Sequence, residues 1–181
     1  TVDAGGAFLD TNGFSIGMNN VLTGAGRLTK LGNGLLTLSG FNTYSGGTTV
    51  RSGTLAVSGS GAYILHDSAS LMVGDAASDN AVLEILNNGA VFSSLSTIAN
   101  QSSSVGRVTV NGGSWLDFST ITVGGSGFGT LEVLDGFVGS TSGIILGASA
   151  GGQGNATVTD GILQTNGNFT VGNSGAGTLV I

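Results

Sequence analysis

Residues 121–147 read ITVGGSGFGTLEVLDGFVGSTSGIILG and hold one complete unit of a repeat. A short apolar run ends at Val123-Gly124, and an equivalent run ends at Leu146-Gly147. The same signature, an aliphatic residue followed by Gly or Ala, recurs at nearly constant spacing along the chain: Val73-Gly74, Ile98-Ala99, Val123-Gly124, Leu146-Gly147 and Val171-Gly172. A fixed period of about 23–25 residues indicates a repeat architecture.

Two further apolar runs follow the first in each unit. The second runs are Ala81–Leu86, Gly106–Asn111, Gly129–Leu134, Asn155–Thr159 and Gly177–Ile181. A turn is expected after each, at Gly89, Gly113, Gly136 and Gly161, and the third runs are Val91-Phe92, Trp115-Leu116, Phe137-Val138 and Ile162-Leu163. Each unit is therefore predicted to contain three short strands.

The second runs alternate with period two, which is typical of a strand with one buried face. Leu83 and Ile85 fall on one face, while the intervening positions, predicted to face solvent, are Glu84, Thr109, Glu132 and Thr157. Helices are disfavoured, because Gly recurs often and the runs are rich in Val and Thr.

Three short strands cannot bury an apolar face alone, so the units must stack. We predict an all-β fold, a right-handed single-stranded parallel β-helix of about seven coils. It would form one segment over residues 1–181, with the rung repeats at 71–181. Interior columns are expected at Val73, Ile98, Val123, Leu146 and Val171, and at Ile85, Val110, Val133, Val158 and Ile181. A β-propeller fits less well, because a blade needs about 40 residues.

The composition excludes several classes of protein. The chain has 181 residues with 35 Gly, no Pro and no Cys, and 40% of its residues are hydrophobic, which argues against collagen, disorder and a disulfide scaffold. Four basic residues and a net charge of −6 make nucleic-acid binding improbable. No apolar run is long enough for a transmembrane helix.

Residues 24–57 carry a sharper motif, GAGRLTKLGNGLLTLSGFNTYSGGTTVRSGTLAV. This stretch resembles the passenger-associated transport repeat of autotransporter proteins, with the family's pattern at Leu28-Thr29-Lys30, Asn42-Thr43-Tyr44 and Gly46–Val50. Thr1–Gly13 is similar to the lead-in common in that family.

The resemblance implies a passenger of type V secretion from a Gram-negative bacterium. Such a chain would be secreted or displayed on the cell surface, anchored in the outer membrane through a barrel outside this sequence, and would contact that barrel only transiently during export. The barrel pattern is not in this chain, so we expect a fragment of a longer passenger, with open apolar columns near Val171, Leu179 and Ile181.

Several carboxylates and one histidine are candidate site residues. Asp135 and Asp160 occupy equivalent turns, close enough if stacked to share a cation, although Asp-Gly is also good turn chemistry. Glu84 and Glu132 lie two rungs apart, loosely like a glycosidase pair, although an exposed face explains them better. His66, followed by Asp67, is the only histidine.

The local motifs for chemistry are equally weak. Gly147–Gly151 satisfies G-x-S-x-G, but no helix follows it, and Gly74–Ser78 only loosely matches a serine protease motif. Gly151–Asn155 covers half of a calcium-binding nonapeptide, and Trp115 is expected to fill the core. We therefore predict no catalytic, cofactor-binding or metal-binding residue, no cofactor and no enzymatic activity.

The predicted function is structural: a surface stalk, part of an adhesin linked to virulence, which supports passenger folding and secretion. Its partners would be a host-cell or matrix receptor, or another copy of the chain. A polysaccharide-active enzyme is one alternative. A self-association module that uses outward ladders such as Thr97, Thr122 and Thr170 is the other.

Overall fold

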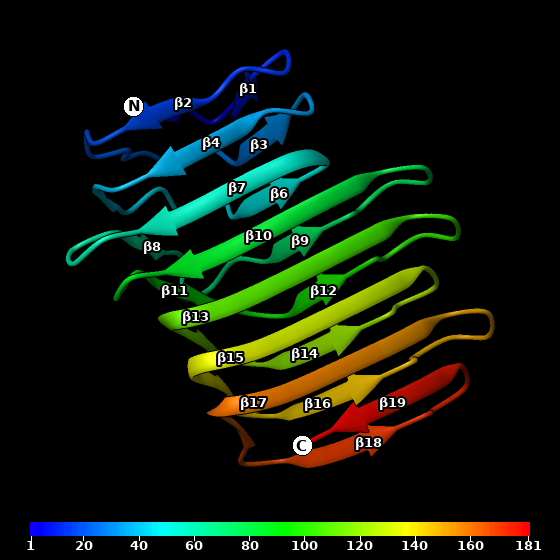
Figure 1. The fold of residues 1–181 in the computed structure, drawn as a ribbon. Coiled ribbons are helices and arrows are strands. Elements are labelled where there is room, and N and C mark those ends of the chain that lie inside the picture. The colour runs from blue at the N-terminus through cyan, green and yellow to red at the C-terminus, as the bar shows by residue number, and fades with distance from the viewer.

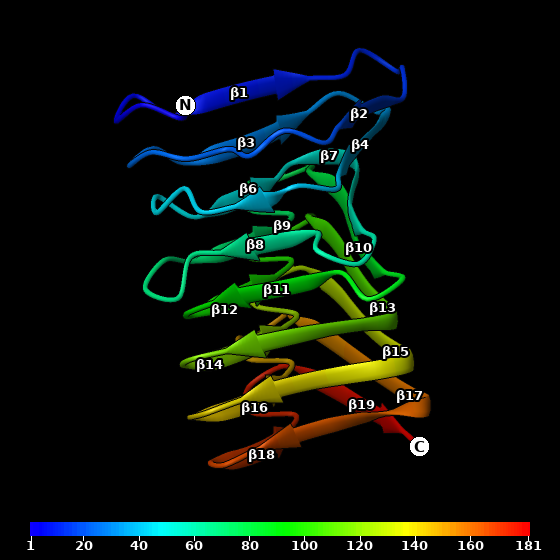
Figure 2. The ribbon, with the colours of Figure 1, turned by 90° about the vertical axis from the view of Figure 1, so that its left-hand side faces the viewer.

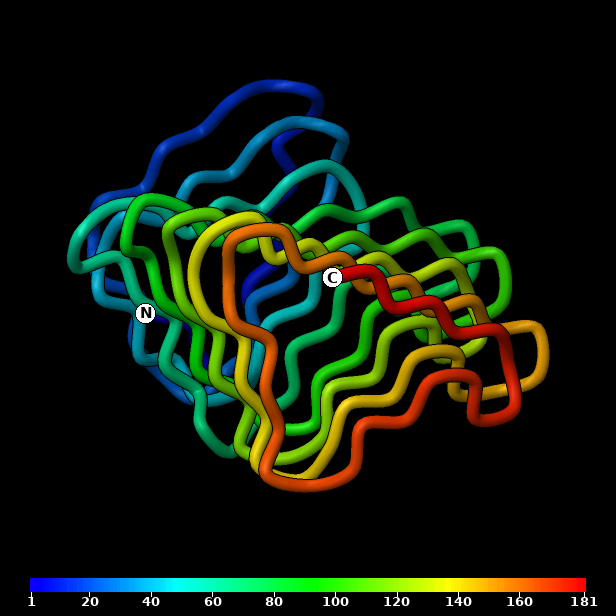
Figure 3. Tube along the Cα trace, turned by 60° about the horizontal axis from the view of Figure 1, so that its bottom comes forward, coloured from blue at the N-terminus to red at the C-terminus, as the bar shows by residue number.

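The computed structural model describes residues 1–181 and contains nineteen strands and no helix. The chain winds into a coil whose turns stack along one axis (Figure 1). As it descends from the N-terminus, the front strands run from right to left and the rear strands from left to right, so the coil is right-handed (Figures 1 and 2). Viewed closer to the axis, successive turns enclose a shared interior (Figure 3). The predicted β-helix is confirmed.

The first sheet contains the first strand of each turn. In stacking order these are β1 (Ala7–Asp10), β3 (Leu28–Leu31), β6 (Thr48–Val50), β9 (Leu71–Val73), β12 (Ser96–Ile98), β14 (Thr120–Val123), β16 (Gly143–Leu146) and β18 (Asn168–Val171). Every neighbouring pair is parallel, as a coil that always turns the same way requires.

The second sheet contains the second strands and bends into a third face. The second strands are β2 (Ile16–Met18), β4 (Leu35–Leu38), β7 (Ser52–Ser58), β10 (Asn80–Leu86), β13 (Val105–Asp117), β15 (Phe128–Ser140), β17 (Gln153–Thr165) and β19 (Ala176–Val180). The third face comprises β5 (Phe41–Asn42), β8 (Tyr63–Leu65), β11 (Ala90–Ser93) and the second halves of β13, β15 and β17.

The strand register reproduces the predicted period. Val73 pairs with Ile98 in the first sheet, and Ile85 pairs with Val110 in the second. Both columns continue through the next turns and are buried, together with the rest of a 29-residue core. In the last turn Val171 and Ile181 are exposed by 46% and 92%, because no turn stacks beneath them.

The first turns are shorter than the later ones. In the first sheet Ala7 pairs with Leu28 and Leu28 pairs with Thr48, so each of these turns takes fewer residues than the turn from Val73 to its partner Ile98. In the first sheet the period predicted from the sequence therefore holds from β6 onward, whereas in the second sheet the turn from Leu55 to its partner Leu83 is longer than that period.

Two kinds of corner separate the strands. The Gly or Ala that closes each first strand from β9 to β18 has a positive φ, including Gly124 (71°) and even Ala99 (58°). A Cβ on Gly124 would lie 2.2 Å from the carbonyl oxygen of Gln153, so the next turn also requires glycine there. The second kind of corner corrects the prediction of turns at Gly113, Gly136 and Gly161. These residues lie inside continuous 13-residue strands that bend at a bulge.

Candidate functional site

A column of buried polar side chains runs along the corner between the third face and the first sheet. Ser93, Asp117 and Ser140 pair in register on successive turns, and the same register continued upward aligns them with His66 and Tyr44. We call these five residues the polar column, and each is at most 3% exposed. Such burial is costly unless every polar atom finds a partner.

His66 is held by a directed chain of hydrogen bonds. The carbonyl oxygen of Ala69 can only accept, so His66 Nδ1 donates to it over 3.2 Å. His66 Nε2 must then accept from the Thr48 hydroxyl at 2.9 Å, and Thr48 accepts from the Tyr44 hydroxyl at 2.7 Å. Burial lowers the pKa of His66 and raises that of Tyr44, so both rings are neutral.

Asp117 occupies the equivalent corner two turns further on. The hydroxyls of Ser93 and Ser96 donate to Oδ2, while the backbone N–H groups of Leu95 and Ser119 donate to Oδ1. Trp115 Nε1 donates to Ser93 Oγ at 2.9 Å. No buried side-chain polar atom in the structure lacks a partner. The column thus joins neighbouring turns by side chains as well as by the strands.

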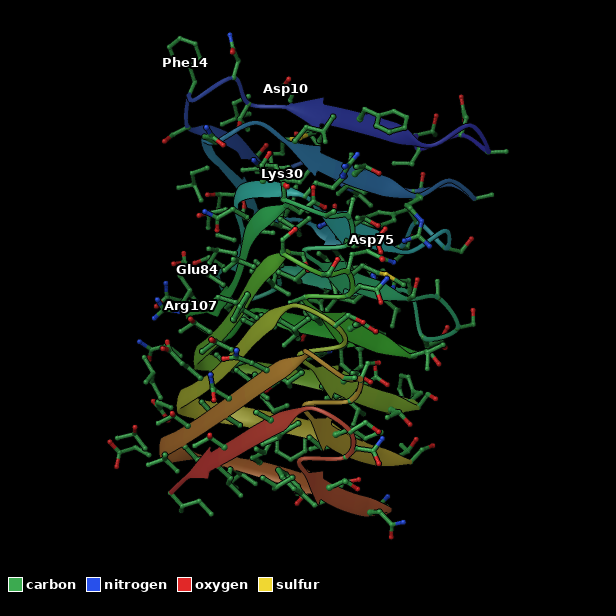
Figure 4. All side chains as sticks on the ribbon, turned by 90° about the vertical axis from the view of Figure 1, so that its right-hand side faces the viewer. Asp10, Phe14, Lys30, Asp75, Glu84 and Arg107 are labelled. Atoms are coloured by element: carbon green, nitrogen blue, oxygen red, sulfur yellow. The ribbon has the colours of Figure 1, made fainter.

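Lys30 lies inside the coil, in the same column of the first sheet as Val50 and Val73. Its Nζ donates to the carbonyl oxygens of Leu31, Gly32 and Ser52, at 2.7–3.0 Å. Burial lowers its pKa, and the nearby carboxylate of Asp10 opposes that shift. Figure 4 shows Lys30 among the N-terminal strands, whereas Glu84 and Arg107 project from the outside of the coil.

Asn42 joins three turns. Its Nδ2 donates to the carbonyl oxygens of Gly40 and Tyr63, at 2.8 and 2.9 Å, and its Oδ1 accepts from the backbone N–H of Leu22 at 3.0 Å. The side chain is fully buried, so these bonds have no competition from water.

These features define a class, a right-handed parallel β-solenoid whose turns are joined internally by buried polar side chains. Within it, residues 28–57 match the family model described as passenger-associated-transport-repeat. The match spans β3 to β7 apart from the last residue of β7, contains Lys30, Asn42, Tyr44 and Thr48, and confirms the resemblance seen in the sequence. It is consistent with an autotransporter passenger domain. Neither the curated proteins nor the solved structures gave a match to the chain.

The acidic candidates lie on the outside of the coil. Asp135 and Asp160 pair in register and are exposed. Glu84, Thr109, Glu132 and Thr157 form one outward column, as predicted, and Glu132 forms a salt bridge with Arg107. No group of three or more His, Cys, Asp or Glu side chains could hold a metal ion.

The serine and histidine candidates are not brought together. His66 contacts Thr48 and Ala69 through its ring nitrogens, while Ser78 and Ser149 lie in exposed corner loops. The last three residues of the Gly151–Asn155 segment, which resembles half of a calcium-binding nonapeptide, begin strand β17. Trp115 is fully buried and pairs with Val91 and Val138, which confirms its predicted place in the core.

Sequence reasoning missed the polar column because its members differ in residue type. One signal could have found it: Ser93, Asp117 and Ser140 each stand two residues after the inward residue of the third strand. Side chains that point inward at this position of the strand should be apolar, so a run of polar ones indicates a hydrogen-bonded corner.

The threonine ladder suggested for self-association is not continuous. Thr97 pairs with Thr122 on the outside of the first sheet, but Ile145 lies between Thr122 and Thr170.

Proposed function

We propose that this chain is part of the rigid stalk of an autotransporter passenger on the surface of a Gram-negative bacterium. The observation that carries the proposal is the continuity of the matched repeat with the rest of the coil. Strands β3 and β6 belong to the same first sheet as β18, and β4 and β7 belong to the same sheet as β19. The matched repeat and the rest of the coil therefore form one continuous structure.

A stacked coil of this kind can act as a rigid spacer. Adjacent strands lie about 4.8 Å apart, so seven turns extend the chain by roughly 35 Å along the axis. A continuous core of 29 residues and the internal side-chain bonds oppose bending between turns. This rigid length would hold further parts of a passenger away from the membrane, and an adhesin role follows if those parts bind a host receptor or matrix.

Support of folding and secretion is the second part of the proposal. A solenoid folds by adding turns to a formed neighbour, since each turn contacts only the turns beside it. Lys30 and Asn42 bond to backbone groups of neighbouring turns, so the matched repeat offers the next turn a fixed template. The chain also has no cysteine that could form a disulfide before export. We propose a structural role and no enzymatic one.

The proposal is tested by fusing the chain upstream of an autotransporter translocator barrel in a Gram-negative host. Surface display is measured with an antibody to an N-terminal tag, and compactness by resistance to added protease. We expect display of a protease-resistant passenger. A chain that remains in the periplasm, while an established passenger on the same barrel is displayed, would contradict the proposal.

Two matched variants test the repeat itself. Asn42→Ala removes the three hydrogen bonds of a buried side chain, whereas Asn33→Ala alters an exposed turn in the same repeat. We expect Asn42→Ala to lower the displayed, protease-resistant fraction severalfold and Asn33→Ala to leave it unchanged. Equal display of the two variants would remove the folding-support role.

A further inference from the structure

An apolar stripe covers the outside of the third face. It descends the side of the coil on which β8 and β11 lie one above the other (Figure 2). Eight side chains form it: Phe41, Tyr63, Leu65, Phe92, Leu116, Phe118, Phe137 and Ile162. We call this set the apolar stripe. Phe41, Phe118 and Ile162 are 46%, 42% and 56% exposed, and the other five are partly exposed.

Four of these rings form a ladder across successive turns. The centroid distances are 5.1 Å from Phe41 to Tyr63, 6.3 Å from Tyr63 to Phe92 and 6.4 Å from Phe92 to Phe118. The last two pairs are nearly parallel, with interplanar angles of 10° and 18°. The rings thus follow one another from turn to turn along this face of the coil.

No charged residue lies between the stripe residues in the third-face strands, but exposed carboxylates border the stripe: Asp67 follows β8, and Asp135 and Asp160 stand two residues before Phe137 and Ile162. The outward positions of the third-face strands, between the stripe residues, are Ala90, Ser114, Gly139 and Gln164. The outward side of the second sheet instead carries Glu84, Arg107 and Glu132. In a chain of net charge −6, the uncharged middle of this face is where two copies can meet with their carboxylates held at its borders.

The spacing of the apolar groups along the stripe also indicates which partner fits it. Apolar groups recur once per turn, about every 4.8 Å along the axis, so a matching surface must repeat at the same interval. A second copy has that interval by construction, and the same patch on both copies gives a closed two-fold pair. We therefore propose that the chain forms a reversible homodimer through the apolar stripe.

The size of the stripe sets the strength of the pair. Only Phe41, Phe118 and Ile162 are more than a third exposed, so the apolar surface of the stripe falls short of the about 800 Å² per partner of a standard interface. Exposed polar side chains between the stripe residues, such as Ser114 and Gln164, enlarge the contact. We expect a weak, concentration-dependent dimer. This inference goes beyond the stalk function and holds whether or not the chain is exported.

Sedimentation velocity over a concentration series of the whole chain tests the proposal. Wild type should shift from monomer to dimer as concentration rises. Phe92→Ser with Phe118→Ser should weaken dimerisation at least tenfold, whereas Met72→Ser with Ile145→Ser, outward apolar residues of the first sheet, should not change it. Thermal melts followed by circular dichroism check that both double variants fold.

Single cysteines then locate the contact, because the chain has none of its own. Under mild oxidation Ser114→Cys, which is exposed near the middle of the stripe, should give a disulfide-linked dimer. Thr122→Cys on the first sheet and Asn168→Cys in the last turn should remain monomeric. A wild type that stays monomeric throughout, or cross-linking through position 168 or 122 in place of 114, would overturn the proposal.

Discussion

His66 shows how one residue makes the coil sensitive to acid. Its neutral ring accepts from Thr48, which accepts from Tyr44. Protonation would turn Nε2 into a donor to Thr48 and leave one hydroxyl proton of the buried Thr48–Tyr44 pair without an acceptor. Burial is the largest influence on the pKa of His66 and lowers it. The charge of Arg27 lowers this pKa further, and the carboxylate of Asp117 raises it. The unfolded chain therefore binds the proton at higher pH than the folded chain does.

We expect stability to fall as the pH drops below about 6.5, by up to about 1.4 kcal/mol per pH unit, until the lowered pKa of folded His66 is reached. Urea denaturation between pH 7.5 and 5 measures this slope. His66→Gln should be less stable at pH 7.5 and should lack the slope. Parallel pH profiles for the variant and wild type would show that this ring does not control acid stability.

At the scale of the element, alternation along one strand separates core from surface. Val133 is fully buried in β15, and its neighbour Glu132 points outward to Arg107. Val133→Asp should cost several kcal/mol, because it places an unpaired charge in the core. Glu132→Ala should cost below about 1 kcal/mol, since it removes only a partly exposed ion pair. Similar urea midpoints for the two variants would mean that the faces are reversed.

The same alternation explains what could be predicted from the sequence. Strands such as β10 repeat aliphatic residues every second position and every turn, so their partners and inward faces follow from the spacing. The polar column could not be predicted in this way, because His66 and Asp117 satisfy the same corner by different hydrogen bonds. The shorter turns before β6 were also missed, because they do not keep the period of the later ones.

The whole molecule is a stack in which, apart from the hydrogen bond from Arg27 to Ser70 near the N-terminus, side chains bond within a turn or to the next one, so a complete turn should be removable. Excising residues 124–146 joins Val123 to Gly147, which occupies the same corner position as Gly124. Strand β14 would then meet β18 in the register that β16 now uses, with Val123 opposite Val171 and Val110 opposite Val158. Excising residues 124–135 removes only half a turn and brings outward side chains into the core. We expect the first deletion to melt cooperatively at a somewhat lower temperature, with the β-rich circular dichroism spectrum kept, and the second to be protease-sensitive. If both deletions unfold, the turns do not act as interchangeable units, and the stability of this coil depends on contacts longer than one turn.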